Sequence, residues 1–192
     1  MKDFEIVDNF IDEKTRETLY NLVIRQSCFA VDRGYAEDHQ DKPRYHVALD
    51  YNAIDDSCFE KVLLNNIVYD ICEKYDAKFS HLMLAITLFG YEGHIHTDDM
   101  SSSDSLSVLV YIHPNWKRKY LGHTLFIMDF DVEKNLTHEF DSHYKDIRAV
   151  FPQPKRAIVY DGSIPHIPGI VSRECYVPRA ILTMRFKKNK KD

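Results

Sequence analysis

The spacing of apolar residues changes near residue 79, and this change constrains the fold more than any other feature of the sequence. Before it, Leu19, Leu22 and Val23 recur at helical spacing, and Asp12 is the expected N-cap of a helix over residues 12–28. Ser57-Cys58-Phe59-Glu60 has the form of a capping box and predicts the start of a second helix. Its apolar stripe would comprise Phe59, Val62, Leu63, Ile67, Ile71 and Tyr75.

After residue 79 the chain is typical of short strands. The segments alternate, are rich in β-branched and aromatic residues, and are separated by turn residues. Strands are predicted at 81–91, 106–113, 123–128, 149–151, 156–160, 166–171 and 180–186, and earlier ones at 4–7 and 45–51. The polar segment 32–44 contains glycine and proline and predicts a loop. We therefore expect a mainly β (α+β) protein, a sandwich or jelly roll with its helices packed on one outer face.

Length and composition predict a single domain and limit the classes of partner that we expect. The 192 residues suit a single domain over 1–192, with N-terminal strands and supporting helices at 1–78, a β core at 79–187 and a basic tail at 188–192. Lys and Arg total 25, Asp and Glu total 30, and the formal net charge is −5, so nucleic acid is not an expected partner. No apolar run suits a membrane span, and the four separated cysteines are expected to be reduced thiols of a cytoplasmic protein.

A candidate metal site begins in the segment that follows the first long strand. The chain turns at Gly93 and becomes extended, so His96 and Asp98, two residues apart, can point to the same side. His166, delivered by a strand and turn, is the best candidate for a third ligand. Two histidines and a carboxylate on one face of an ion are the ligand set of non-haem Fe(II) oxygenases.

Other interpretations of these histidines are open. His96 and Asp98 could be an exposed pair at a turn, and His39-Gln40-Asp41 repeats the motif in a polar loop with no strand after it. His94 is expected to line the mouth of the site or to face solvent. A dizinc hydrolase site of the His-x-His-x-Asp kind is disfavoured because strands and helices do not alternate along the chain.

From about residue 84 to residue 186, the order of motifs resembles the 2-oxoglutarate/Fe(II)-dependent dioxygenase superfamily, especially its prolyl-4-hydroxylase-like members, including those of phages. The motifs that carry the resemblance are His96-Thr97-Asp98, the strand and turn 108–116, the segment Leu121-Gly122-His123-Thr124-Leu125-Phe126, the strand 156–161, His166 and Arg179. The chain departs from the pattern at Gly122-His123, where relatives often have two glycines. It departs again at Ile181, where many have a hydroxyl residue.

The resemblance implies a double-stranded β-helix in which His96, Asp98 and His166 hold Fe(II). It implies 2-oxoglutarate and O2 as cosubstrates and ascorbate as a further candidate cofactor. Arg179 matches the residue that pairs with the far carboxylate of 2-oxoglutarate, with Arg173 and Arg185 as alternatives. Tyr111 matches a tyrosine that binds the same carboxylate, although it could be a core residue, and Tyr91 matches one near the cosubstrate or substrate more loosely.

The implied function is hydroxylation of a C–H bond with release of succinate and CO2, most directly on a prolyl residue of a peptide or protein. A free amino acid or another small molecule is the alternative substrate. A cupin with a different metal, or a non-catalytic jelly-roll binding module, is the alternative from another class. The polar segments 32–44 and 129–146 are both candidates for a lid or a substrate loop.

Overall fold

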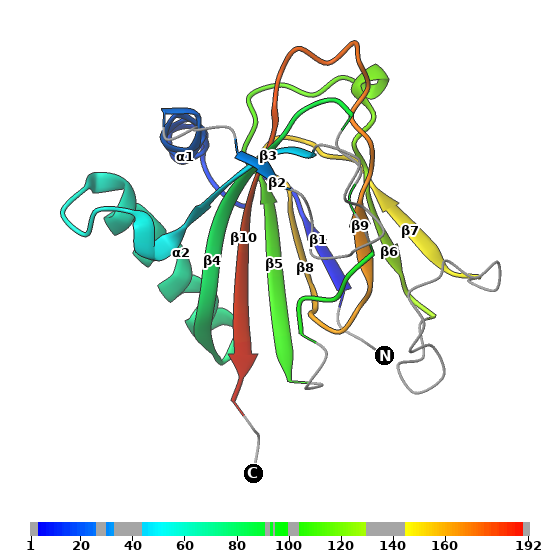
Figure 1. Cartoon of the computed structure of the whole chain (residues 1–192). Coiled ribbons are helices and arrows are strands. Elements are labelled where there is room, and N and C mark those ends of the chain that lie inside the picture. The colour runs from blue at the N-terminus through cyan, green and yellow to red at the C-terminus, as the bar shows by residue number, and fades with distance from the viewer. Residues whose placement is uncertain are drawn as a thin grey trace.

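The structure is a computed structural model that describes residues 4–25, 30–32, 44–90, 93, 95–99, 104–129 and 145–189. Ten strands and two main helices make up these parts of the chain (Figure 1). In chain order they are β1 (Phe4–Val7), α1 (Glu13–Arg25), β2 (Ala30–Asp32), β3 (Arg44–Asp50), α2 (Phe59–Tyr75), β4 (Ala77–Thr87), β5 (Ser105–Tyr111), β6 (Thr124–Ile127), β7 (Ile147–Val150), β8 (Ala157–Asp161), β9 (His166–Pro168) and β10 (Arg179–Lys188). Short 3-10 turns cover Tyr51–Ala53 and Arg118–Tyr120.

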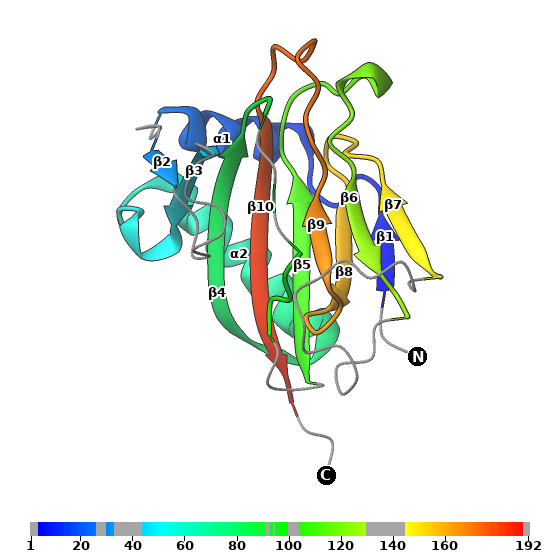
Figure 2. The ribbon, with the colours of Figure 1, turned by 45° about the vertical axis from the view of Figure 1, so that its right-hand side comes forward.

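The strands form two facing sheets. The larger has the order β1-β8-β5-β10-β4-β3-β2, and the smaller has the order β7-β6-β9. All recorded strand pairs are antiparallel. Figure 2 shows the small sheet in front of one half of the large sheet, and the helices lie behind the large sheet. The predicted jelly roll with helices on one outer face is therefore confirmed.

Each central strand of the large sheet contributes to two cores because alternate side chains point to opposite faces. Even-numbered residues of β5 and β10, such as Val108 and Leu182, pack against the apolar faces of α1 and α2. Odd-numbered residues, such as Leu109 and Tyr111, face the small sheet and form a second core with Phe126. The interior between the sheets is the space into which functional side chains can point.

The helices differ from the prediction in detail. Asp12 accepts a hydrogen bond from the Thr15 amide at 2.7 Å, as expected of an N-cap, and α1 ends at Arg25. The predicted capping box at Ser57 is wrong, because the N-cap of α2 is Cys58, whose Sγ accepts a bond from the Lys61 amide. Ser57 instead bonds Asp55.

The predicted apolar stripe of α2 is also partly wrong. Phe59 and Val62 are exposed, whereas Lys61 is only 5% exposed. The Lys61 ammonium donates to the carbonyl of Tyr51 at 2.7 Å and lies over its ring, so the buried charge has partners that an apolar pattern does not reveal. The helix consequently buries the face that carries Leu64.

The predicted strands are present, with ends that differ by a few residues, and β2 was not predicted. Most of the predicted loop 32–44 lies outside the described residues. Cys58, Cys72 and Cys175 are free thiols, and Cys28 lies outside the described parts. Within the described chain, no helix is both long and apolar enough to cross a membrane.

His113, just after β5, is fully buried and bonded to the backbone on both sides. Its Nε2 lies 2.8 Å from the Pro152 carbonyl, and its Nδ1 lies 3.3 Å from the Ala180 carbonyl. Burial lowers the pKa of this imidazole from 6.5 to about 3, because desolvation outweighs the two carbonyl contacts that favour the charged form. His113 is therefore neutral at neutral pH.

We expect this burial to make folding stability depend on pH. The unfolded imidazole takes up a proton near pH 6.5 but the folded one does not until about pH 3, so stability decreases as the pH falls between these values. The contribution from His113 amounts to about 2 kcal/mol between pH 7 and pH 5. Urea unfolding at both pH values should show a smaller decrease for His113→Gln than for the wild type; equal decreases would contradict the prediction.

Candidate metal centre and a buried arginine

Two backbone connections bring the predicted metal ligands together. His96 and His166 form an isolated antiparallel bridge, with amide-to-carbonyl distances of 3.0 and 2.9 Å, and their rings lie 4.3 Å apart. The Asp98 amide donates to the Gly162 carbonyl at 2.9 Å. As a result, one ligand atom from each of His96, Asp98 and His166 lies within 4.8 Å of the others.

The hydrogen bonds of His166 determine which nitrogen is available. Its Nδ1 lies 3.1 Å from the Ile164 carbonyl, which can only accept, so Nδ1 carries the proton. Burial lowers the pKa of His166, and the ring is neutral at neutral pH. The lone pair is therefore on Nε2, which is the form of histidine that binds a metal.

The Asp98 carboxylate is buried among donors. Its side chain is 2% exposed, its Oδ1 pairs with Nη2 of Arg185 at 2.7 Å, and its Oδ2 accepts a bond from the Tyr160 hydroxyl at 2.7 Å. Burial raises the pKa of this carboxyl, but the charge of Arg185 and the hydrogen bond from Tyr160 favour the ionised form, and the pKa lies below its usual value. Asp98 is thus ionised.

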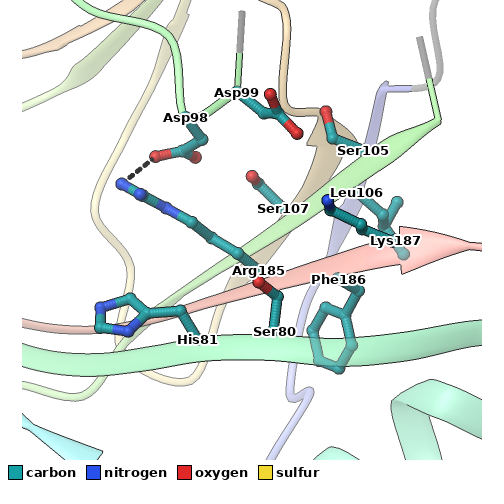
Figure 3. Close-up of a pocket in the computed structure, with 10 residues that line it drawn as sticks. All are labelled: Ser80, His81, Asp98, Asp99, Ser105, Leu106, Ser107, Arg185, Phe186 and Lys187. Atoms are coloured by element: carbon teal, nitrogen blue, oxygen red, sulfur yellow. Dashed lines mark ion pairs between the residues drawn. The ribbon is translucent and has the colours of Figure 1, made fainter. Parts of the chain in front are cut away.

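These protonation states fit a divalent metal ion. A neutral imidazole with a free lone pair and an ionised carboxylate are already in the states that metal binding requires, so no proton must first be removed. The nitrogen and oxygen donors of the three residues are those of a two-histidine, one-carboxylate iron site. Figure 3 shows Asp98 at the wall of a pocket, paired with Arg185.

Arg179 occupies a second polar site in the same interior. It begins β10, is 1% exposed, and donates from Nε to the Gly122 carbonyl at 3.1 Å and from Nη2 to Thr124 Oγ1 at 2.8 Å. Within the described chain, its buried Nη1 has no hydrogen-bond partner and no carboxylate pairs with the guanidinium. A buried cation without a counter-charge is costly, and an anionic ligand would relieve that cost.

Tyr111 lies beside Arg179 in this second polar site. Its hydroxyl lies 2.6 Å from Thr124 Oγ1, and the Arg179 guanidinium lies 5.4 Å from its ring. Gly122 has a φ of +72°, and a Cβ there would lie 3.0 Å from the Trp116 ring, so glycine suits this wall for two reasons. The second polar site therefore has a guanidinium N–H without a partner in the described chain beside hydroxyl groups, a combination that suits a carboxylate.

The three candidate arginines have different surroundings in the structure. Arg179 is buried beside Tyr111, Arg185 pairs with Asp98, and Arg173 is exposed in a turn. Tyr91 and His94 lie outside the described residues, as does the second His-x-Asp motif at 39–41.

Sequence reasoning missed two polar residues of the interior, Thr124 and Tyr160. Both lie on strands that were predicted, so alternation along each strand could have placed them on the inner face. Tyr160 is fully buried, and its hydroxyl contacts Asp98 and lies 3.3 Å from His166 Nε2.

Comparisons with solved structures identify the fold. A prolyl-4-hydroxylase from Pseudomonas putida matches with a TM-score of 0.67 and 15% identity over 99% of this chain and 95% of that one. A prolyl hydroxylase from Trichoplax adhaerens, in complex with a peptide fragment of the hypoxia inducible factor oxygen degradation domain, matches with a TM-score of 0.65 and 16% identity. It covers 96% of this chain and 83% of that one.

A viral collagen prolyl hydroxylase from Paramecium bursaria Chlorella virus-1, solved with 2-oxoglutarate, has a TM-score of 0.56 and 12% identity over 97% of this chain and 96% of that one. No protein-family model and no curated protein sequence matches the chain. The chain nevertheless has the double-stranded β-helix fold of the prolyl-4-hydroxylase-like 2-oxoglutarate oxygenases.

Proposed function

We propose that this protein is an Fe(II)- and 2-oxoglutarate-dependent oxygenase that hydroxylates a C–H bond of a prolyl residue in a peptide or protein. In this reaction one atom of O2 enters the C–H bond to give an alcohol. The other enters the new carboxylate of succinate, and the keto acid loses CO2. Substrate, O2 and 2-oxoglutarate therefore balance against alcohol, succinate and CO2.

The observation that carries the proposal is that the metal-ligand cluster and the buried Arg179 face the same interior at a short separation. Phe126 of β6 pairs with His166, and Thr124, two residues earlier, bonds Arg179. Two strand residues span roughly 7 Å. A five-carbon dicarboxylate held at the metal by its keto-acid end can therefore place its far carboxylate at Arg179.

Each residue has a distinct role in this proposal. His96, Asp98 and His166 hold Fe(II) on one face and leave the remaining positions to ligands. When bound, the ion and 2-oxoglutarate supply the oxidising chemistry. Arg179 and Tyr111 orient the cosubstrate, and the buried walls of the interior exclude water.

The choice of a prolyl substrate is supported only by the similarity of this fold to solved structures. The three similar structures are prolyl hydroxylases, and the Trichoplax enzyme holds a peptide. A polar cavity beside Asp98 offers room for a substrate group next to the proposed metal centre.

The first test is anaerobic addition of Fe(II) and 2-oxoglutarate to metal-free protein. We expect the visible charge-transfer band of the chelated keto acid, followed by succinate formation once O2 is admitted. Asp98→Ala should abolish both because an anionic ligand is lost, whereas the exposed control Asp146→Ala should retain both. Succinate formation by an Asp98→Ala protein whose metal content has been measured would contradict the assignment of Asp98 as a metal ligand.

Loss of the Arg179 side chain should weaken 2-oxoglutarate binding without removing the metal. Charge-assisted hydrogen bonds are worth about 1.5–3 kcal/mol each, so Arg179→Met should raise the 2-oxoglutarate KM roughly tenfold to a hundredfold. Titration of the visible band measures this affinity directly. Arg173→Met, at an exposed turn, is the control, and an unchanged KM in Arg179→Met would refute the role of Arg179.

Tyr160 should act as a positioning residue for the metal ligands. Removal of its hydroxyl in Tyr160→Phe frees Asp98 Oδ2, and loss of such an outer partner lowers metal affinity roughly tenfold or more. Titration with Co(II), followed by visible absorption, measures that affinity. Tyr120→Phe alters another fully buried tyrosine outside the metal-ligand cluster and should bind Co(II) as the wild type does. Equal affinities for all three proteins would overturn the role of Tyr160.

A further inference from the structure

A polar cavity of about 280 Å³ lies at one end of the interior, beside Asp98 (Figure 3). Part of its wall is built from two adjacent strands of the large sheet, β5 and β10. Arg185 on β10 pairs in register with Ser107 on β5, and Lys187 pairs with Ser105. Residues two apart on a strand point to the same face, so these four polar side chains line one surface.

This end of the interior is open to solvent. Along β10, Arg179 is 1% exposed, the Arg185 side chain is 39% exposed, and Lys187 is exposed. Arg179 and Arg185 are six residues apart, which is roughly 20 Å along a strand. The two arginines therefore lie at opposite ends of the interior, and Arg185 is at the end that a substrate can enter.

The cavity wall contains buried polar atoms that the described residues do not satisfy. Ser105 Oγ and Arg185 Nε are buried and have no hydrogen-bond partner in the described parts of the chain, whereas the buried Ser107 hydroxyl is within hydrogen-bond reach of Asp98. A buried polar group without a partner destabilises the folded protein by about 1–3 kcal/mol. A ligand that supplies hydrogen-bond acceptors can recover this free energy. Two hydroxyls, a guanidinium and an ammonium can all donate to one acceptor group, and a carboxylate accepts such bonds best.

The metal centre and this wall are electrostatically coupled. Arg185 Nη2 contacts Asp98 Oδ1 at 2.7 Å, so Asp98 is its counter-charge in the present structure. A divalent cation on Asp98 would share that carboxylate. The cavity would then hold the two cations Arg185 and Lys187 with one further carboxylate, that of Asp99, which has an interaction of its own.

We propose that Arg185, Lys187, Ser105 and Ser107 form a subsite for a carboxylate of the substrate. This inference rests on the proposed function and names its substrate class: a proline unit that bears a carboxylate or lies next to one. The carboxylate is either that of free or C-terminal proline or that of a neighbouring acidic side chain. Arg179 holds the cosubstrate at the closed end of the interior, and Arg185 holds the substrate at the open end.

The test titrates the anaerobic Fe(II)–2-oxoglutarate complex of the full chain with matched pairs of ligands, and follows the visible band. One pair is L-proline and L-prolinamide. The other is acetyl-prolyl-glutamate amide and acetyl-prolyl-glutamine amide. We expect the carboxylate member of one pair to bind roughly tenfold or more tightly than its neutral partner, and the pair that responds identifies the source of the carboxylate.

Variants separate a binding role from a structural one. Arg185→Gln should remove the preference for the carboxylate member while the dissociation constant of its neutral partner changes less than about twofold. Lys187→Gln should reduce the preference, and Lys188→Gln, on the opposite face of β10, should retain it. Determination of KM under O2 should show a larger rise in KM for the carboxylate substrate than for its neutral partner in Arg185→Gln.

The outcomes distinguish this inference from the function on which it rests. Failure to form the visible band overturns the proposed function and the subsite with it. A normal band with equal binding of both members of each pair, or with no binding of any carboxylate member, overturns the subsite alone. A full preference retained by Arg185→Gln also overturns it.

Discussion

The register of β10 against its neighbours is the constraint on which the interior depends. This strand pairs with β4 along its whole length and with β5 from Ile181 to Lys187. Its even-numbered residues pack under the helices, so its odd-numbered residues, Arg179 and Arg185 among them, must face the small sheet. A slip of one residue would put both arginines into the layer under the helices, whose buried side chains in the described chain are mostly apolar.

The interior between the sheets contains buried polar groups, and their burial without partners costs free energy. Nη1 of Arg179, Nε of Arg185 and the Ser105 hydroxyl are buried without partners in the described chain. The helix-facing core on the other side of the same sheet is almost wholly apolar and provides stability that can offset this cost. Ligands that satisfy these groups will stabilise the folded state in proportion to their affinity.

Much of the architecture could be predicted because it follows from local patterns. Alternation identified the strands, and helical spacing with Asp12 as the N-cap located α1. The predictions were wrong where a side chain has an environment or a role that is unusual for its residue type. Lys61 is buried because the carbonyl of Tyr51, the first residue of a 3-10 turn, accepts from its ammonium, and Cys58 replaces Ser57 as the N-cap of α2. No pattern of apolar residues contains that information.

The sequence by itself determined the types of strand and helix, the face of each strand that is apolar, and the His-x-Asp spacing that can place two ligands on one side. Only the tertiary structure decided which distant residues meet. It brought His166 to His96 through a backbone bridge and placed Tyr160 against both Asp98 and His166. It also assigned Arg179 and Arg185 to opposite ends of one interior. Periodicity acts over neighbouring residues, whereas these contacts join residues far apart in the chain and depend on strand pairing and register.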